Sequence, residues 1–330
     1  MKEIQAIVGR LLAPETRDTV LATLVSVEGS SYRRPGARLL VDTNGRRTGS
    51  ISGGCLEEDV LARARRVLAT GQAETVTYDT TSENDLVWGV GLGCHGVVSI
   101  LLERLPAQPD WAVTLAANFA ARRPTRLTVV HRADQPADLG TRLAAASALA
   151  DAAIFLDNVP PPTALVIFGA GDDAQPLARL AKELGWHVTI ADPRAAFATA
   201  ARFPVADGFV VAPAEELVAR TQPDSDTLAV VMTHHYVHDV PLLRDLLARP
   251  LAYLGMLGPR KRAQKILADL TAAGTASTPE RSGQLRAPVG LDLGADTPEQ
   301  VALAIIAEMQ AVLNRRDARP LRERAGPIHE

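Results

Sequence analysis

The sequence predicts an α/β protein with an N-terminal mixed α+β domain, residues 1–150, and a C-terminal domain, residues 151–330, with a doubly wound parallel sheet. The 330 residues exceed what one ordinary hydrophobic core holds. Hairpin signals mark the first part, whereas strands alternate with helices in the second. Between them, an Ala- and Asp-rich stretch at 133–152 leads to three prolines at 160–162, which stiffen the chain.

The first domain begins with an apolar, β-branched run at 19–27, which predicts a strand. Asn44-Gly45 joins the next two runs, 38–41 and 46–50, into a hairpin. Apolar residues at helical spacing predict a helix over 56–69, which Gly71 ends. Further strands are expected at 75–78, 97–102 and 126–131, and a further helix at 111–121.

The second domain begins with a strand at 164–168, a helix at 174–184 and a strand at 187–191. Apolar runs at 208–211 and 228–232 continue the alternation, with helical segments between them. Residues 272–288 are rich in Ala, Thr, Ser and Gly and are expected to form a loop. The last helix starts at Thr297, which is followed by Pro298 and by Gln300, a capping-box pattern.

A glycine motif follows the strand at 164–168. Gly169 and Gly171 stand in a G-x-G-x-x-A pattern that opens a helix, and Asp192 ends the next strand at the spacing of a ribose contact. Such glycines let a pyrophosphate approach the backbone and the helix N-terminus. The pattern predicts a Rossmann-like domain. Because Asp172 and Asp173, expected in the first helical turn, would repel phosphate if they pointed inward, both nucleotide binding and an altered or empty site remain open.

The two cysteines of the chain each lie in a glycine-rich turn. Cys55 follows Gly53 and Gly54, and Cys94 stands between Gly93 and His95. Glycine lets the backbone beside each sulfur approach another molecule closely. The pattern indicates thiol chemistry or binding of a soft metal by the two cysteines. A zinc site is disfavoured because the chain has no C-x-x-C pair.

A histidine cluster at 233–239 (Thr-His-His-Tyr-Val-His-Asp) follows the strand at 228–232. The carboxyl end of a strand in an open α/β sheet is where ligands bind. His234 and His238 share a helix face only if the helix begins this early. Metal ligation, a polar wall of a binding site and a helix-capping turn all remain open.

Composition narrows the function classes. A net charge of −3 and an aromatic content of 4% disfavour nucleic-acid binding, which needs basic patches and stacking rings. Neither a signal peptide nor a run of about 18 apolar residues is found, so no membrane association is expected. We expect a cytoplasmic protein, in which thiols are normally reduced, so that a disulfide is not the default.

Taken together, four stretches resemble the XdhC/CoxI family of accessory proteins of xanthine dehydrogenase and related molybdenum hydroxylases. They are a first loop at 29–38, the cysteine motif at 49–58, the second cysteine motif at 91–96, and a C-terminal set made of the Gly169 loop, Thr233-His234, 253–258 and 288–292. They span roughly residues 20–315 in the family's order. The chain departs from the family at His95, usually glycine, and at Asp172, often histidine.

The resemblance implies a maturation factor more than a turnover enzyme, and no catalytic residue is assigned. It would bind the molybdenum cofactor (molybdopterin), hold it while a cysteine desulfurase supplies sulfur, and deliver it to a xanthine dehydrogenase-type apo-enzyme. It would also form a homo-oligomer. Cys55 and Cys94 are the expected metal ligands, and Gly53, Gly54 and Gly93 support them. His95, Gly169, Gly171, Asp192 and His234 complete the candidate cofactor-binding residues.

Two other functions fit the residues. One is an NAD(P)-dependent oxidoreductase that uses the Rossmann-like domain with a cysteine or His234. The other is a redox-sensing interaction protein in which Cys55 and Cys94 form a disulfide.

Overall fold

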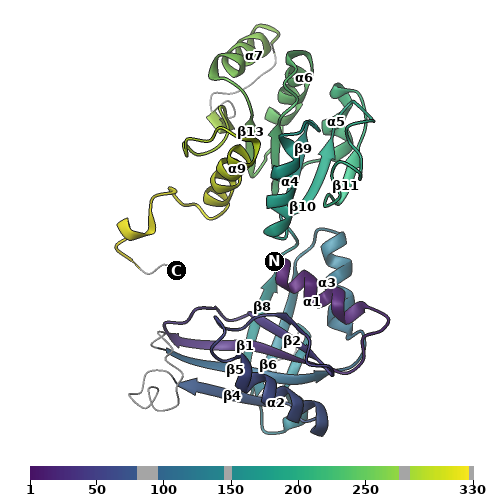
Figure 1. Ribbon diagram of the computed structural model, residues 1–330, viewed down its shortest axis with the longest axis vertical. Helices are drawn as coiled ribbons and strands as arrows, with labels where there is room; N and C mark the ends of the chain where they lie inside the picture. The colour runs from purple at the N-terminus through teal and green to yellow at the C-terminus, as the bar shows by residue number, and fades with distance from the viewer. Residues whose placement is uncertain (80–95, 145–150, 275–282, 327–330) are drawn as a thin grey trace. The chain divides into compact units, whose positions relative to one another are not determined.

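The computed structural model describes residues 1–79, 96–144, 151–274 and 283–326, and it divides into two compact units, Met1–Pro162 and Thr163–Glu330 (Figure 1). The expected boundary at 150/151 precedes strand β8 (Ala153–Val159), which pairs with β6 (Thr125–Arg132) of the first unit. Asp157 of β8 also forms an ion pair of 2.8 Å with the buried Arg38. β8 therefore belongs to the first unit.

The first unit contains a five-stranded antiparallel sheet in the order β3-β2-β1-β5-β4. Its strands are β1 (Thr19–Gly29), β2 (Arg38–Asp42), β3 (Arg47–Gly49), β4 (Glu74–Asp79) and β5 (Gly96–Leu105). The hairpin β2–β3 turns at Asn44-Gly45, as expected.

Both faces of this sheet are covered. Helix α2 (Glu57–Thr70) packs on one face, and it ends at Gly71, whose φ of 72° lies in the left-handed region. Helices α1 (Lys2–Leu12) and α3 (Asp110–Ala120) pack on the other face, which Leu21 and Leu40 present. A small sheet in the order β7-β6-β8, with β7 at Gly140–Leu143, also packs on this second face.

The second unit is a six-stranded sheet in the order β11-β10-β9-β12-β13-β14, with parallel pairing throughout. Its strands are β9 (Ala164–Phe168), β10 (His187–Ala191), β11 (Gly208–Val210), β12 (Thr227–Val231), β13 (Tyr253–Met256) and β14 (Leu285–Arg286). The strand order reverses between β9 and β12, so their carboxyl ends form the topological switch point.

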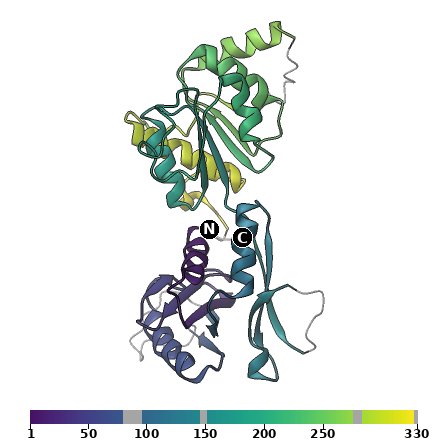
Figure 2. The same cartoon turned by 90° about the vertical axis from the view of Figure 1, so that its right-hand side faces the viewer.

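Helices cover both faces of this parallel sheet (Figure 2). On one face lie α4 (Ala174–Glu183) and α9 (Pro298–Leu313); on the other lie α5 (Ala214–Thr221), α6 (Tyr236–Leu247) and α7 (Arg260–Ala272). The capping box predicted at Thr297 is present. The expected α/β class, a mixed α+β region followed by a Rossmann-like parallel sheet, is confirmed.

Two expectations need correction. The stretch 272–288 is not a loop throughout, because Leu285 and Arg286 form β14 by pairing with Leu254 and Gly255. Asp173 is the N-cap of α4, and Asp172 precedes it, so neither lies in the first helical turn. Among the described helices, none combines the length and apolar character needed to cross a membrane.

Candidate functional site

The loop that carries Cys55 joins β3 to α2 and is held by the side chain of Ser52. The Ser52 hydroxyl accepts hydrogen bonds from the backbone N–H groups of Gly54 and Leu56, each at 3.2 Å, and donates to the carboxylate of Glu57. Gly54 has a φ of 112°, which glycine adopts without strain. The loop thus turns back on itself and leaves Cys55 exposed.

Glu57 is the buried anchor of this loop. It is 7% exposed and accepts a hydrogen bond of 3.0 Å from the Ser52 backbone, besides the one from the Ser52 hydroxyl. Burial alone would raise the pKa of Glu57, but the hydrogen bonds from Ser52 and Ser50 outweigh it and hold that pKa below its ordinary value. The side chain is therefore ionised at neutral pH and faces the serines.

A cavity of about 520 Å³ opens beside the Cys55 loop. The residues that line it include Tyr32, Arg33, Arg47, Gly53, Gly54 and Glu57. The carboxylate of Glu3 in α1 accepts hydrogen bonds from the Arg33 guanidinium and from the Ser50 backbone N–H, and both of these residues line the cavity. The cavity joins the first loop and the first cysteine motif of the sequence.

The second cysteine motif cannot be placed beside this cavity. Gly93, Cys94 and His95 lie outside the described residues, so the pairing or joint ligation of Cys55 and Cys94 stays a prediction.

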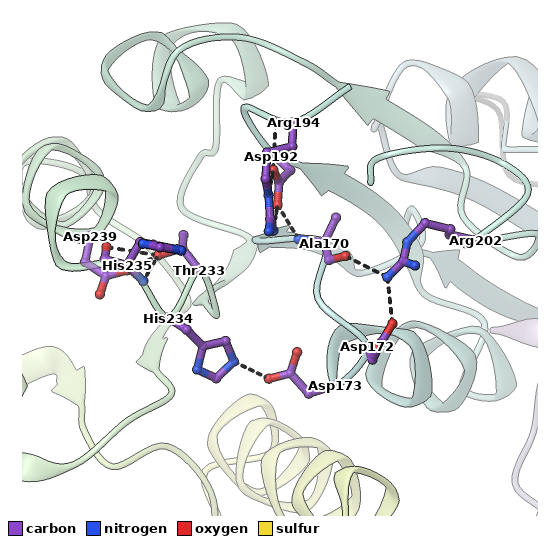
Figure 3. Close-up of polar contacts among 10 residues, drawn as sticks. All are labelled: Ala170, Asp172, Asp173, Asp192, Arg194, Arg202, Thr233, His234, His235 and Asp239. Atoms are coloured by element: carbon purple, nitrogen blue, oxygen red, sulfur yellow. Dashed lines mark hydrogen bonds and ion pairs between the residues drawn. The ribbon is translucent and has the colours of Figure 1, made fainter. Parts of the chain in front are cut away.

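The second candidate cluster lies at the switch point of the parallel sheet (Figure 3). Gly169, with a φ of 119°, follows β9, and a Cβ there would lie 2.5 Å from the backbone oxygen of Met232 at the end of β12. Only glycine permits this approach. It brings the Gly169 loop and the segment after β12 side by side.

The buried side chain of Asp192 binds the backbone of the glycine loop. It is 1% exposed and accepts hydrogen bonds from the Ala170 backbone at 2.7 Å and from the Arg194 backbone and guanidinium at 2.8–2.9 Å. Burial alone would raise the pKa of Asp192, but these hydrogen bonds hold it below its ordinary value. The residue expected to contact a ribose thus has both oxygens bonded within the protein.

His234 and Asp173 bridge the switch point, and the ring of His234 points toward Asp173 in Figure 3. Their Nε2 and Oδ2 atoms are 2.6 Å apart, and this contact raises the pKa of His234. His234 has a φ of 59°, an uncommon left-handed conformation for this residue type. His234 precedes helix α6, and its imidazole is directed to Asp173.

The remaining members of the histidine cluster have structural contacts. The Thr233 hydroxyl accepts a hydrogen bond of 3.0 Å from the His235 backbone N–H and donates to the carboxylate of Asp239. Asp239 is fully buried and forms an ion pair with Arg262 of α7. His234 precedes α6 and so does not share its face with His238. In the described ranges, no three histidine, cysteine or acidic side chains gather as a metal site.

Three residues of these clusters have no clear signal in the sequence. Arg202 donates to the Ala170 carbonyl at 3.2 Å and to Asp172 at 2.7 Å, across about 30 residues of sequence. Arg47 reaches the cavity because the Asn44-Gly45 hairpin folds β3 back onto β2. Glu57 was visible in the sequence only as an acidic residue at a helix N-terminus.

Two family models match the chain: the XdhC and CoxI family over residues 12–79, and the XdhC Rossmann domain over residues 165–309. A protein of Bacillus subtilis (strain 168) named as a probable xanthine dehydrogenase subunit is 35% identical over 322 residues, which cover 90% of this chain and 94% of that protein. The molybdenum cofactor insertion chaperone PaoD of Escherichia coli (strain K12) is 28% identical to this chain. The similar region covers 90% of this chain and 84% of PaoD.

A solved structure agrees with both units. The crystal structure of a xanthine dehydrogenase from Bacillus halodurans matches with a TM-score of 0.81 at 28% identity, over 97% of this chain and 98% of that one. These similarities extend over nearly the full length of the chain. They agree with its cysteine motifs and with its parallel sheet and Gly169 loop. The chain belongs to the XdhC and CoxI family.

Proposed function

We propose that this protein binds the molybdenum cofactor as its cargo and serves in the maturation of a xanthine dehydrogenase-type enzyme. The observation that carries the proposal is the likeness, over 90% of the chain, to a relative named a molybdenum cofactor insertion chaperone and to one named as part of a probable xanthine dehydrogenase. Both relatives match across the two units, so the likeness is not limited to a common Rossmann-like domain.

The residues around Cys55 fit such a cargo. Cys55 presents an exposed thiol, a soft ligand that suits molybdenum. Gly54 leaves its backbone uncovered, and the cavity of about 520 Å³ is of the size of small-molecule sites. Ser52 and Glu57 hold the loop in one conformation, so the thiol is positioned before the cargo arrives.

The finer steps also belong to the proposal. Cys55 and Cys94 would hold the metal, a cysteine desulfurase would supply sulfur to the bound cofactor, and the loaded protein would dock on the apo-enzyme. Turnover by the protein itself is not part of the proposal. NAD(P) binding gains no support from the contacts of Asp192, whose oxygens are bonded to Ala170 and Arg194.

A transfer experiment tests the function. The protein, loaded anaerobically with molybdenum cofactor, is mixed with apo-xanthine dehydrogenase, and the appearance of xanthine oxidation is followed in the presence of an excess of an unrelated cofactor-binding protein. We expect wild type to activate the apo-enzyme faster than free cofactor does, and Cys55→Ala to lose that advantage. Equal activation by free cofactor, wild type and Cys55→Ala would remove the proposal.

A further inference from the structure

The cavity beside Cys55 contains a cation whose charge the fold leaves unmatched. Arg47, on β3, is exposed and lines the cavity. In the described part of the chain, no carboxylate pairs with its guanidinium and no acceptor binds it. The neighbouring Arg33 differs, because its charge is matched by Glu3. A planar guanidinium with free N–H groups is suited to a phosphate.

The acidic side chains near the cavity are turned to other partners. Glu57, which also lines the cavity, accepts hydrogen bonds from Ser50 and Ser52, and Glu3 accepts from Arg33 and from the Ser50 backbone. Both carboxylates thus have hydrogen-bond donors within the protein, whereas the Arg47 guanidinium has no such partner among the described residues. The cavity is therefore suited to an anionic group at its Arg47 side.

An aromatic ring lies at the same cavity. Tyr32 is 67% exposed, and a Cβ built on Gly53 would lie 3.7 Å from its ring. The tyrosine thus lies against the bare backbone of the cysteine loop and leaves much of its ring to solvent. An exposed ring face next to a cavity can stack on a planar heterocycle. Ring and guanidinium together select a flat molecule that carries an anionic tail.

The glycine loop of the Rossmann-like domain has the opposite character. Asp172, Asp173 and Asp192 surround it, and each is already paired, with Arg202, His234 and Arg194 respectively (Figure 3). The Ala170 amide is bonded to Asp192. The Ala170 amide, Arg194 and Arg202 already bind carboxylates at this loop, whereas no carboxylate pairs with Arg47 in the described part of the chain.

We infer that the cavity recognises the organic part of the cofactor: Arg47 binds the terminal phosphate and Tyr32 stacks on the planar pterin ring. The inference rests on the proposed function and adds that the phosphate is read by the N-terminal unit, not by the Rossmann glycine loop.

The test compares two probes, molybdopterin and the same pterin after enzymatic removal of its phosphate, bound anaerobically to the full-length protein in equilibrium dialysis. Four proteins are measured: wild type, Arg47→Gln, Arg47→Lys and the control Arg46→Gln. Arg46 is an exposed neighbour that does not line the cavity. Its replacement removes the same charge from the hairpin without touching the site.

We expect removal of the phosphate and Arg47→Gln each to weaken binding about tenfold, the range of a charge-assisted contact. In combination they should cost no more than either alone, which shows that they are one interaction. Arg47→Lys should retain part of the preference, and Arg46→Gln all of it. Tyr32→Ala should weaken both probes equally, whereas Tyr32→Phe should not.

The outcomes separate the two proposals. If wild type binds both pterins with equal affinity, or Arg47→Gln keeps the wild-type preference, the inference is overturned and the proposed function stands. If wild type binds neither probe, the inference and the proposed function fail together. Loss of the preference in an Asp192→Asn variant but not in Arg47→Gln would place the phosphate at the glycine loop instead.

Discussion

Replacing Glu57 by Gln should loosen the Cys55 loop and leave the rest of the molecule folded. The buried carboxylate accepts hydrogen bonds from the Ser52 backbone and hydroxyl, and the same hydroxyl accepts from the Gly54 and Leu56 amides. Hydrogen bonds to a charged group contribute about 1.5–3 kcal/mol net. Glutamine keeps one acceptor oxygen but turns an NH₂ group toward the Ser52 donors.

We therefore expect Glu57→Gln to cost about 2 kcal/mol of local stability, which corresponds to roughly 30-fold faster amide exchange at Gly54 and Leu56. Hydrogen exchange at residue resolution measures this directly. The matched control is Glu58→Gln, an exposed neighbour in the same helical turn. It removes a similar helix-dipole interaction of about 0.3–1 kcal/mol but none of the loop hydrogen bonds.

The stabilisation of the loop by Glu57 should also depend on pH in a defined direction. Because the pKa of folded Glu57 lies below the unfolded value of 4.5, its stabilisation is complete above that value and is lost as the pH falls through the folded pKa. Wild-type protection at Gly54 and Leu56, corrected for intrinsic exchange, should fall on the acid side, and Glu57→Gln should show no such fall. Equal exchange in Glu57→Gln and Glu58→Gln at neutral pH would refute this reasoning.

Three further predictions concern other parts of the fold. Asp173→Asn should lower the pKa of His234 in an NMR titration, because the contact with Asp173 raises that pKa. The stabilisation by this pair is complete below 6.5, the pKa of the imidazole in the unfolded chain, and disappears as the pH rises through the folded pKa. Gly49→Ala should lower the free energy of unfolding by well over 2 kcal/mol in thermal unfolding, because Gly49 has a φ of 90° and its Cβ would lie 2.3 Å from a backbone oxygen. The control Gly45→Ala should cost about 1–2 kcal/mol, because Gly45 has a φ of 75° but open space around it. Thr297→Ala should cost about 1 kcal/mol in urea unfolding of the second unit through loss of its capping box.

Elements with strong local signals were predictable. The Asn44-Gly45 hairpin, the helix ended by Gly71 and the Thr297 capping box are all set by residues close in sequence. β14 was not, because Leu285 and Arg286 become a strand only through pairing with β13. The sequence pattern likewise predicts no strand at β8, because Ala153–Val159 pairs with β6, which is distant in the sequence.

The site divides in the same way. The exposure of Cys55 in a glycine turn was indicated by Gly53 and Gly54, because bare backbone is a local property. The contact between His234 and Asp173 spans 61 residues of sequence, and it depends on the close approach of the Gly169 loop to β12. No spacing rule within one segment predicts such a pair. The contribution of Cys94 stays a prediction.

The central claim is that the protein carries the molybdenum cofactor through its cysteine loop. The most direct measurement is the molybdenum and pterin content per chain of the anaerobically purified protein, after incubation with free cofactor, for wild type, Cys55→Ala and Cys94→Ala. We expect near-stoichiometric cofactor in wild type and its loss in Cys55→Ala, with Glu58→Gln as wild type. A wild type that stays empty in the presence of free cofactor, or a Cys55→Ala variant that stays fully loaded, would contradict the claim.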